Sequence, residues 1–423
     1  MQLTRRYFLK SAGLSLFGVG AVPAFLRRAA FAVPSASFRK KIFVAIFQRG
    51  AADGLNIVIP YGEQDYYTMR PTIAIPAPGK SLDAREAGIN LDGFFAFHPS
   101  LEALKSIFDQ GHLAVIEAAG SPNNTRSHFE AQDFMETATP GQSNTKDGWL
   151  NRYLVHSPEA DATPFRAVAA TPRMPLTLEG PAHALAIGDL RSFRLHLNPN
   201  QPGMAGMESA LATLYASTSD PLLSDTAREA FSAARTLERI GNQLYIPENG
   251  ARYPNGPFGR HMQEVAQLIK EGLGLEIAFV DVGGWDHHVN EGGITGQLAA
   301  RLRDFGDSLA AFYQDMGSRM ADVVVLTMSE FGRTARENGN RGTDHGHANV
   351  MFAIGGPVRG GRIYGQWPGL KPNQLNEDRD LALTTDFRDV FAEIVVRHLG
   401  TQSASSIFPG YEVSPGRFPG LCA

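Results

Sequence analysis

The chain has 423 residues, of which 43% are hydrophobic and 19% are charged. This balance is typical of a globular protein with a large core, built as one domain with insertions or as two domains. The formal net charge of −4 leaves no surplus of basic residues to neutralise phosphates, so the composition argues against a nucleic-acid-binding protein. The single cysteine, Cys422, has no intramolecular partner, which excludes a fold held together by disulfides.

The first 32 residues have the pattern of an export signal. Paired arginines in "TRRYFLK" (Thr4–Lys10) precede an apolar, glycine-rich run (Ala12–Leu26) and an A-x-A site that ends at Ala32. This order resembles a twin-arginine signal peptide. The alternative is a membrane anchor, but the run is shorter than the roughly 20 residues that span a bilayer. We therefore expect residues 33–423 to be carried by the twin-arginine translocase to the periplasm or extracellular space, without a stable membrane span.

Five short apolar runs predict strands that are buried on both faces of a sheet. They are rich in Val, Ile and Phe without polar alternation, and turn residues follow several of them: Lys41–Phe47, His112–Gly120, Leu275–Gly284, Asp322–Met328 and Asn349–Gly356. Such runs are typical of a largely parallel sheet whose two faces are covered by helices.

Helical patterns lie between several of these runs. The clearest is a stripe at spacings of four and three, formed by Leu298, Leu302, Phe305, Leu309, Phe312 and Met316. A second helix is expected over Thr385–Leu399 with Asp386 as its N-cap, and a third around Met262. The alternation of strands and helices predicts an α/β fold. The irregular region over about 172–256 is predicted to be an insertion or cap.

Polar residues collect where four of the predicted strands end. In chain order they are Asp53; Asn124, Arg126, Ser127 and His128; Asp281, Asp286, His287 and His288; and Glu330 with Arg333. Ligands of open α/β sheets bind beyond the carboxyl ends of the strands. The loop "GTDHGHAN" adds Asp344, His345 and His347. A mixed Asp, Glu and His set suits Zn, Mn or a pair of ions that includes Mg, so one or two divalent ions are expected.

Each of these residues also has an ordinary structural explanation. Asp53 could cap a turn, and Glu330 could pair with Arg333. His287 and His288 are adjacent, and neighbours on an extended segment point to opposite sides, so we expect at most one of them to bind a metal.

Ser127 is open to two interpretations. With Glu130 three positions later, it matches a capping box at a helix start. A hydroxyl at a helix N-terminus is also well placed to meet an anionic ester, and a nearby metal would lower its pKa enough to make it a nucleophile. The two roles are compatible.

The order of these motifs resembles the alkaline phosphatase superfamily of metal-dependent phosphatases, sulfatases and phosphomutases. More closely, it resembles a bacterial family of twin-arginine-exported proteins of unknown function within that superfamily. The pieces that carry the closer resemblance are "RGAADGLN", "RSHFEAQDFME", "GGWDHH", "SEFGRT" and "TDHGHAN" followed by "GGPVRGGRIYG". The resemblance implies an alkaline-phosphatase-like sandwich with a central, mostly parallel sheet flanked by helices.

The resemblance also implies roles for single residues. Asp53 would be a metal-bridging aspartate, Ser127 the nucleophile, Asp286 and His288 ligands of one metal, and His345 a further metal histidine. One position departs from the superfamily pattern, because Phe331 stands after Glu330 where a histidine is usual. A second metal would then need His347 or His287.

Together these observations predict a metal-dependent hydrolase of phosphate or sulfate esters. The expected metal ligands are Asp53, Asp286, His288, Glu330, Asp344, His345 and His347, with Ser127 or a water as nucleophile and Asn124, Arg126 and Arg333 binding the anionic substrate. The main alternative is a non-catalytic periplasmic or cell-surface metal-binding module on the same scaffold. A metal-independent Ser-His hydrolase is the weakest alternative, since the chain lacks a G-x-S-x-G motif.

Overall fold

The centre of the molecule is a nine-stranded sheet. The structure is a computed structural model, and it describes residues 40–159, 162–190 and 232–422. All five predicted strands are confirmed: β1 (Ile42–Gln48), β5 (Leu113–Gly120), β8 (Ile277–Val282), β9 (Val323–Met328) and β10 (Asn349–Gly355). The remaining strands are short: β6 (Ala167–Ala170), β7 (Leu185–Ala186), β11 (Arg362–Tyr364) and β12 (Thr385–Asp386).

The strands are mostly parallel. Their order is β11-β5-β10-β9-β1-β8-β6-β7, with β12 beside β5. β1 runs parallel to β8 and β9, whereas β10 is antiparallel to its neighbours β9 and β5. The carboxyl ends of β1, β5, β8 and β9 therefore lie at the same edge of the sheet as the start of β10. This arrangement confirms the predicted α/β class and brings the polar segments to one edge.

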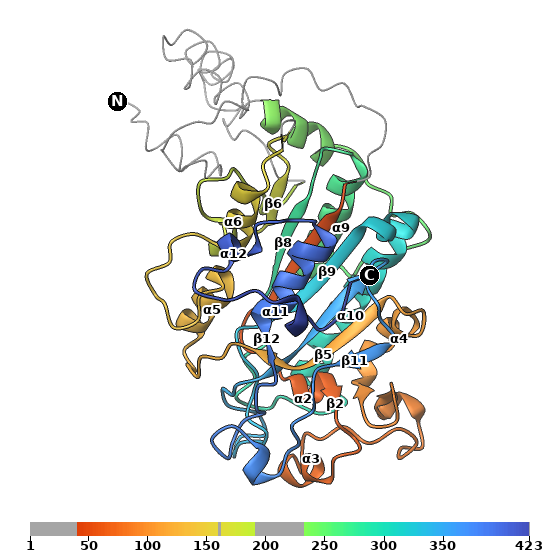
Figure 1. The fold of residues 1–423 in the computed structure, drawn as a ribbon. Coiled ribbons are helices and arrows are strands. Elements are labelled where there is room, and N and C mark those ends of the chain that lie inside the picture. Colours follow the sequence, from red (N-terminus) through yellow and green to blue (C-terminus); the bar gives the residue numbers. More distant parts are fainter. Residues whose placement is uncertain (1–39, 160–161, 191–231, 423) are drawn as a thin grey trace, which may run out of the picture.

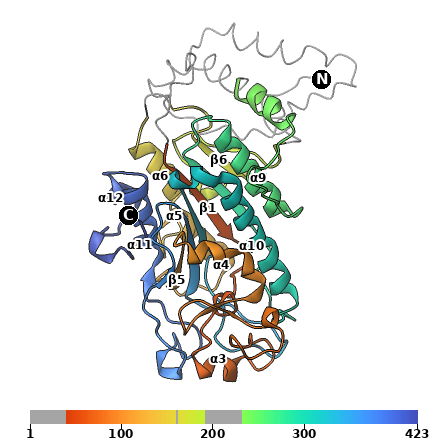
Figure 2. The ribbon, with the colours of Figure 1, turned by 90° about the vertical axis from the view of Figure 1, so that its right-hand side faces the viewer.

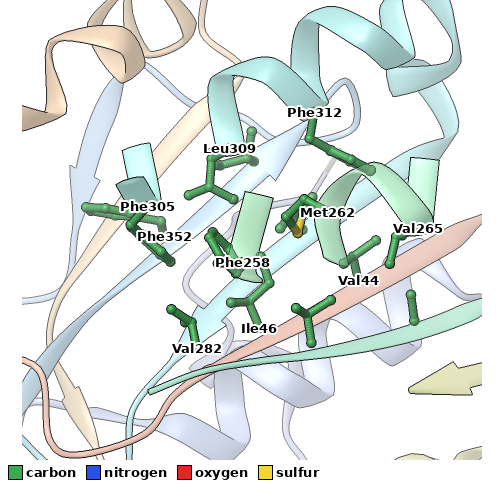
Figure 3. Packing of buried hydrophobic residues seen from close by; sticks show 14 of the residues in the cluster. Val44, Ile46, Phe258, Met262, Val265, Val282, Phe305, Leu309, Phe312 and Phe352 are labelled. Carbon is green, nitrogen blue, oxygen red and sulfur yellow. The ribbon is translucent and has the colours of Figure 1, made fainter. Parts of the chain in front are cut away.

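Helices cover both faces of the sheet (Figures 1 and 2). One face carries α4 (Glu102–Asp109), α9 (Pro257–Lys270) and α10 (Gln297–Met316), and the other carries α5 (His128–Thr137), α6 (Trp149–His156), α11 (Phe387–Glu393) and α12 (Ala404–Ile407). The side chains of β1 alternate between these two layers. Val44 and Ile46 pack under α9 and α10 (Figure 3), and Phe43 packs against Trp149 on the opposite face.

The predicted helices owe their positions to these contacts and to their caps. Every residue of the apolar stripe on α10 is buried, and each such side chain contributes roughly 1.5–3 kcal/mol by leaving water. The Asp386 side chain accepts a hydrogen bond from the Arg388 N–H, so the predicted N-cap of α11 is confirmed. This helix continues as a π-helical turn, η8 (Ile394–His398).

Smaller elements complete the molecule. A second sheet of three antiparallel strands consists of β2 (Val58–Ile59), β4 (Ala96–Phe97) and β3 (Ile89–Asn90), with α2 (Gly54–Ile57) and α3 (Gln64–Met69) beside it in the chain. The 3-10 turns are η3 (Ala84–Glu86), η4 (Pro99–Leu101), η5 (Leu176–Leu178), η6 (Gly317–Asp322), η7 (Pro372–Gln374) and η9 (Pro415–Arg417).

Two predicted regions fall largely outside the described residues. The export signal, residues 1–32, lies outside them entirely, as do residues 191–231 of the predicted cap. Of the rest of that region, β7 joins the edge of the main sheet, and residues 232–241 are helical with Leu237 and Ile240 in the core. No helix in the described part of the chain is long and apolar enough to cross a membrane.

Candidate metal centre

Three imidazole rings and one carboxylate converge at the carboxyl edge of the sheet. They belong to His128 at the start of α5, Asp286 and His288 after β8, and His345 before β10, and we name them the histidine cluster. Asp286 Oδ1 lies 3.0 Å from His288 Nε2 and 3.5 Å from His345 Nε2, and Asp286 Oδ2 lies 3.6 Å from His128 Nε2. The Nε2 atom of each ring thus faces the same carboxylate.

The contacts of the Nδ1 atoms of His345 and His288 determine which ring nitrogen carries the proton. The other nitrogen, Nε2, then carries the lone pair. His345 Nδ1 lies 2.8 Å from the carbonyl oxygen of Arg126, which can only accept, so Nδ1 carries the proton. His288 Nδ1 lies 2.9 Å from a carboxylate oxygen of Asp344. The two Nε2 atoms, 2.9 Å apart, then present lone pairs to each other. That contact is unfavourable unless the two nitrogens share a proton or a metal ion.

His128 is oriented in the same manner. Its Nδ1 lies 2.8 Å from Glu330 Oε1, and its Nε2 is buried without a hydrogen-bond partner among the described residues. The hydrogen bond with Glu330 raises the pKa of His128 more than burial lowers it. Metal-binding histidines usually donate their outer nitrogen to a carboxylate or a carbonyl in this way. His128, Asp286 and His345 therefore offer two imidazole nitrogens and one carboxylate that are close enough to share a divalent metal ion, and His288 lies beside them against Asp286.

Glu330 is placed differently from the predicted metal ligand. Its buried carboxylate accepts hydrogen bonds from His128, from Gln132 Nε2 at 2.9 Å, from the Gly50 N–H at 2.9 Å and from the Ser329 hydroxyl at 3.1 Å. Burial alone would raise the pKa of Glu330, but these hydrogen bonds lower it below its ordinary value. Three donors hold Glu330 Oε1, so this ionised carboxylate orients His128 through the Nδ1 atom of the ring.

Phe331, which follows Glu330 in the chain, lies against two of the histidine rings. Its ring stacks on His128 with centroids 5.1 Å apart and lies 5.1 Å from the His345 ring. With Ala51 and Ala131 it forms a small apolar group. The Phe331 ring therefore forms an apolar wall beside His128 and His345. Within the described ranges, one group of three potential ligands is close enough to share an ion, namely His128, Asp286 and His345.

Arg333 also differs from its predicted role in substrate binding. Its fully buried guanidinium donates to the carbonyl oxygens of Ala51 (2.7 Å), Gly50 (2.7 Å) and Thr343 (3.0 Å), and to Asp286 Oδ1 (2.5 Å). Burial raises the pKa of Asp286, but Arg333 outweighs it and lowers the pKa below the ordinary value. Arg333 therefore ties the loops together and keeps Asp286 ionised.

Asp53, predicted as a metal-bridging ligand, instead forms a buried ion pair with Arg70. Both carboxylate oxygens face the guanidinium, one of them at 2.9 Å. Burial raises the pKa of Asp53, but Arg70 outweighs it and lowers the pKa. The neighbouring Glu291 is buried as well, and burial together with the charge of Asp53 raises its pKa well above the ordinary value. The Thr343 hydroxyl donates to Glu291 Oε2 at 2.8 Å. Asp53 is therefore committed to a buried ion pair next to Glu291.

Ser127 directly precedes His128 of the cluster at the start of α5. It occupies the N-cap position of α5, but its hydroxyl makes no capping hydrogen bond, and Glu130 instead accepts from the Thr125 hydroxyl at 2.6 Å. The predicted capping box is therefore wrong, and the Ser127 hydroxyl is not committed to the helix. It is flanked by Arg126, whose carbonyl accepts from His345, and by His128.

The predicted substrate-binding residues Asn124 and Arg126 both reach the surface. Asn124 is exposed. Arg126 is partly exposed, and its Nη2 atom donates to Glu377 at 2.7 Å and to Asp380 at 2.6 Å. An anionic substrate would have to compete with these two carboxylates for Arg126.

Asp344, His347 and His287 lie outside the histidine cluster, the first partly exposed and the two histidines buried. Asp344, which is half exposed, is the acceptor for His288 and lies outside the cluster itself. His347 is buried near Asp380, and burial lowers its pKa. His287 is buried too, and burial lowers its pKa to about 4, so only the second histidine of the adjacent pair reaches the cluster.

His128 is the member of the cluster that sequence reasoning left out of the metal ligands. It was grouped with Ser127 at the end of a predicted strand, in "RSHFE". The available signal was its position next to Ser127 at the helix start. Only the fold shows that its ring turns toward Asp286.

The fold and the cluster define an α/β protein with a polar centre at the carboxyl edge of its sheet. The family model described as "Protein of unknown function (DUF1501)" matches residues 40–407, and the chain belongs to this family. Among solved structures it is similar to the PsFucS1 sulfatase from Pseudoalteromonas sp., at 11% identity and a TM-score of 0.40, covering 90% of this chain and 73% of that one. It is also similar to the PH0037 protein from Pyrococcus horikoshii, at 11% identity and a TM-score of 0.30, covering 75% and 86%. A search of curated proteins finds no match.

Proposed function

We propose that this protein is a metal-dependent hydrolase of phosphate or sulfate esters. The observation that carries the proposal is the convergence of three imidazole Nε2 atoms on Asp286, with each Nδ1 atom held by a separate acceptor. The ligands for one divalent ion would be His128, Asp286 and His345, with His288 next to them against Asp286. A ligand set with imidazole nitrogens favours Zn over Mg and Mn, which prefer oxygen ligands.

The residues around the cluster support hydrolysis of an anionic ester. A divalent ion bound there would supply a Lewis acid that polarises the ester oxygens and lowers the pKa of a nearby hydroxyl or water. Ser127 offers a hydroxyl without a capping bond beside the cluster. In the proposed reaction its oxygen attacks phosphorus or sulfur, its proton passes to solvent, and the bond to the leaving oxygen breaks, with that oxygen taking a proton from water. A water molecule then attacks the resulting phospho- or sulfo-serine ester, which releases inorganic phosphate or sulfate and restores the Ser127 hydroxyl. Arg126 would exchange its carboxylate partners for the ester oxygens and balance their growing charge.

A second candidate function is a non-catalytic metal-binding module. Two observations favour it: the apolar ring of Phe331 stacks on His128 beside the cluster, and Glu330 Oε1 is held by three hydrogen-bond donors. Such a module would gain stability from one metal ion without turning over any ester.

Turnover separates the two functions. The protein over residues 33–423 is purified without chelator, its metal content is measured by elemental analysis, and it is assayed with aryl phosphate, phosphodiester and aryl sulfate esters. The hydrolase proposal expects about one ion per chain and hydrolysis that is lost with chelator and in the Ser127→Ala variant. Metal binding without turnover above Ser127→Ala would favour the module, and absence of bound metal after reloading would overturn both.

We also propose that the protein acts after export by the twin-arginine route, because of the pattern in residues 1–32. The test is to replace Arg5 and Arg6 together by Lys and to compare the protein in the periplasmic and cytoplasmic fractions. Unchanged distribution between the fractions would contradict this proposal.

A further inference from the structure

We propose that Gln132 and Arg49 are positioning residues of the metal centre, which hold Glu330 and through it the ring of His128. The inference rests on the proposed metal site. It concerns residues that are not themselves in the histidine cluster, and it explains why three donors converge on the Glu330 oxygen that contacts His128.

Gln132 carries a hydrogen-bond donor to the same oxygen that orients His128. Its Nε2 donates to Glu330 Oε1 at 2.9 Å, while its own Oε1 accepts from Arg49 Nη1 at 2.9 Å. An arginine N–H can only donate, so the amide oxygen has to face Arg49 and the amide N–H₂ has to face Glu330. The amide thus has one orientation that satisfies both neighbours.

Helix geometry makes this arrangement a single unit. Gln132 follows His128 by four residues on α5, so the two side chains lie on the same face of the helix. One helical turn therefore delivers two donors to Glu330 Oε1, and the Gly50 N–H adds a third from the loop after β1. Rotation of the Glu330 carboxylate would break all three hydrogen bonds together.

Arg49 connects this unit to two other elements. Besides Gln132, its guanidinium contacts Asp281 at the end of β8 (2.7 Å) and Glu136 on the next turn of α5 (2.8 Å). Asp281, one of the polar residues at the predicted strand ends, is thereby committed to Arg49. The guanidinium pairs with both carboxylates and also donates an N–H to the amide. Without it, the amide of Gln132 would be free to flip and turn its oxygen toward the Glu330 carboxylate.

Loss of Gln132 should weaken metal binding without abolishing it. Loss of the Gln132 amide leaves His128, Asp286, His288 and His345 in place but removes one of the three donors at Glu330 Oε1. The His128 ring then has more freedom to tilt away from Asp286. Loss of such an outer partner typically weakens metal affinity about 10- to 100-fold.

The test measures the affinity of metal-free protein for Zn²⁺ and for Mn²⁺ by competition with a chromogenic chelator. We expect Gln132→Met, which keeps the length of the side chain, to bind about 10- to 100-fold more weakly than wild type. Gln132→Glu retains an acceptor for Arg49 but has no N–H for Glu330, so it should be weakened at least as much. Asp133→Asn, on an exposed position of the same helix, is the matched control and should bind like wild type.

A double-mutant cycle distinguishes positioning from packing. If Gln132 acts through Glu330, then Gln132→Met in a Glu330→Gln background should weaken affinity less than about twofold further, because coupled residues are non-additive. Thermal melting without metal verifies that each variant is folded. Equal affinity of wild type and both Gln132 variants would overturn this inference alone, as would full additivity with Glu330→Gln. Absence of ion binding by the wild type would overturn the proposed function as well.

Discussion

Two polar groups meet at the carboxyl edge of the sheet, and they are built in opposite ways. In the ion pair of Asp53 and Arg70, both carboxylate oxygens contact the guanidinium, and Arg70 also donates to the carbonyl oxygens of Thr334 and Ala335. In the histidine cluster, by contrast, the Nε2 atoms of His288 and His345 face each other, and His128 Nε2 has no hydrogen-bond partner among the described residues. The first group has its hydrogen bonds complete within the chain, which is what a structural role requires. The second group gathers ring nitrogens and a carboxylate that can each serve as a metal ligand.

The largest effect is expected from removing Arg70, the partner of Asp53 in the buried ion pair. Arg70→Met removes the guanidinium and leaves the Asp53 carboxylate buried without its partner. Breaking a buried pair in this way typically costs about 3–5 kcal/mol, so we expect the free energy of unfolding, measured with urea, to fall by that amount. The matched control is Arg85→Met, which removes an arginine from an exposed pair with Asp83 and should leave the unfolding midpoint unchanged. A fall of less than about 1 kcal/mol for Arg70→Met would show that Asp53 has another partner.

The second prediction concerns the open group. His345→Ala should leave the metal-free protein within about 1 kcal/mol of the wild type, because this residue is partly exposed and its Nε2 contacts are unfavourable without an ion. A metal at 100 times its Kd stabilises a protein by about 2.7 kcal/mol. We expect wild type to gain that stability with Zn²⁺ or Mn²⁺ and His345→Ala to gain none.

The neighbouring histidine provides the control for this prediction. His347→Ala alters a buried residue that lies outside the cluster, so it should lose stability with and without metal alike and keep the metal-dependent gain. Equal metal-dependent gains for wild type and His345→Ala would remove His345 from the site.

A third prediction concerns Gly50, whose backbone contacts Glu330 and Arg333 next to the histidine cluster. Gly50 has a φ of +116°, and a Cβ atom added there would lie 2.9 Å from the backbone nitrogen of Asp286. Gly50→Ala should therefore cost about 1–3 kcal/mol in backbone strain and displace Asp286, which would weaken metal binding. Gly79 also has a positive φ, of +74°, but nothing lies within 4 Å of its added Cβ. Gly79→Ala should cost stability without any change in metal affinity, and the measurements are urea unfolding and chelator competition.

The fold followed from the sequence because its strongest signals are local. Non-alternating apolar runs gave all five long strands, and a six-residue stripe gave α10, since burial on both faces of a strand and on one face of a helix leaves a pattern over neighbouring residues. The direction of β10 was not predictable, because an apolar run looks the same in a parallel and in an antiparallel strand.

The candidate site was predictable only in part, because the contacts that build it are long-range. Asp286, His288 and His345 were selected from their motifs, and the structure brings them together. Asp53 and Glu330 carry equally suggestive motifs, but their settings depend on Arg70 and Gln132, which no local pattern connects to them. Whether a carboxylate faces a metal site or an arginine is decided by long-range contacts that a single sequence does not display.

The last prediction concerns a buried histidine that belongs to neither group, and its effect is confined to acidic pH. His398 Nε2 donates to the Ile42 carbonyl at 2.9 Å, and burial lowers the pKa of His398 to about 4 from its ordinary 6.5. Between pH 6.5 and 4 the unfolded chain therefore binds a proton at this position that the folded chain does not. The stability contributed by the neutral ring is fully present above pH 6.5 and is lost as the pH falls toward 4, by up to about 1.4 kcal/mol per pH unit. His398→Gln, which has an N–H for the same carbonyl, should flatten the slope of unfolding free energy against pH in this window and leave it parallel to wild type above pH 7. Identical slopes below pH 6.5 would mean that His398 is protonated in the folded protein, and that a complete hydrogen bond to a carbonyl does not by itself keep a buried imidazole neutral.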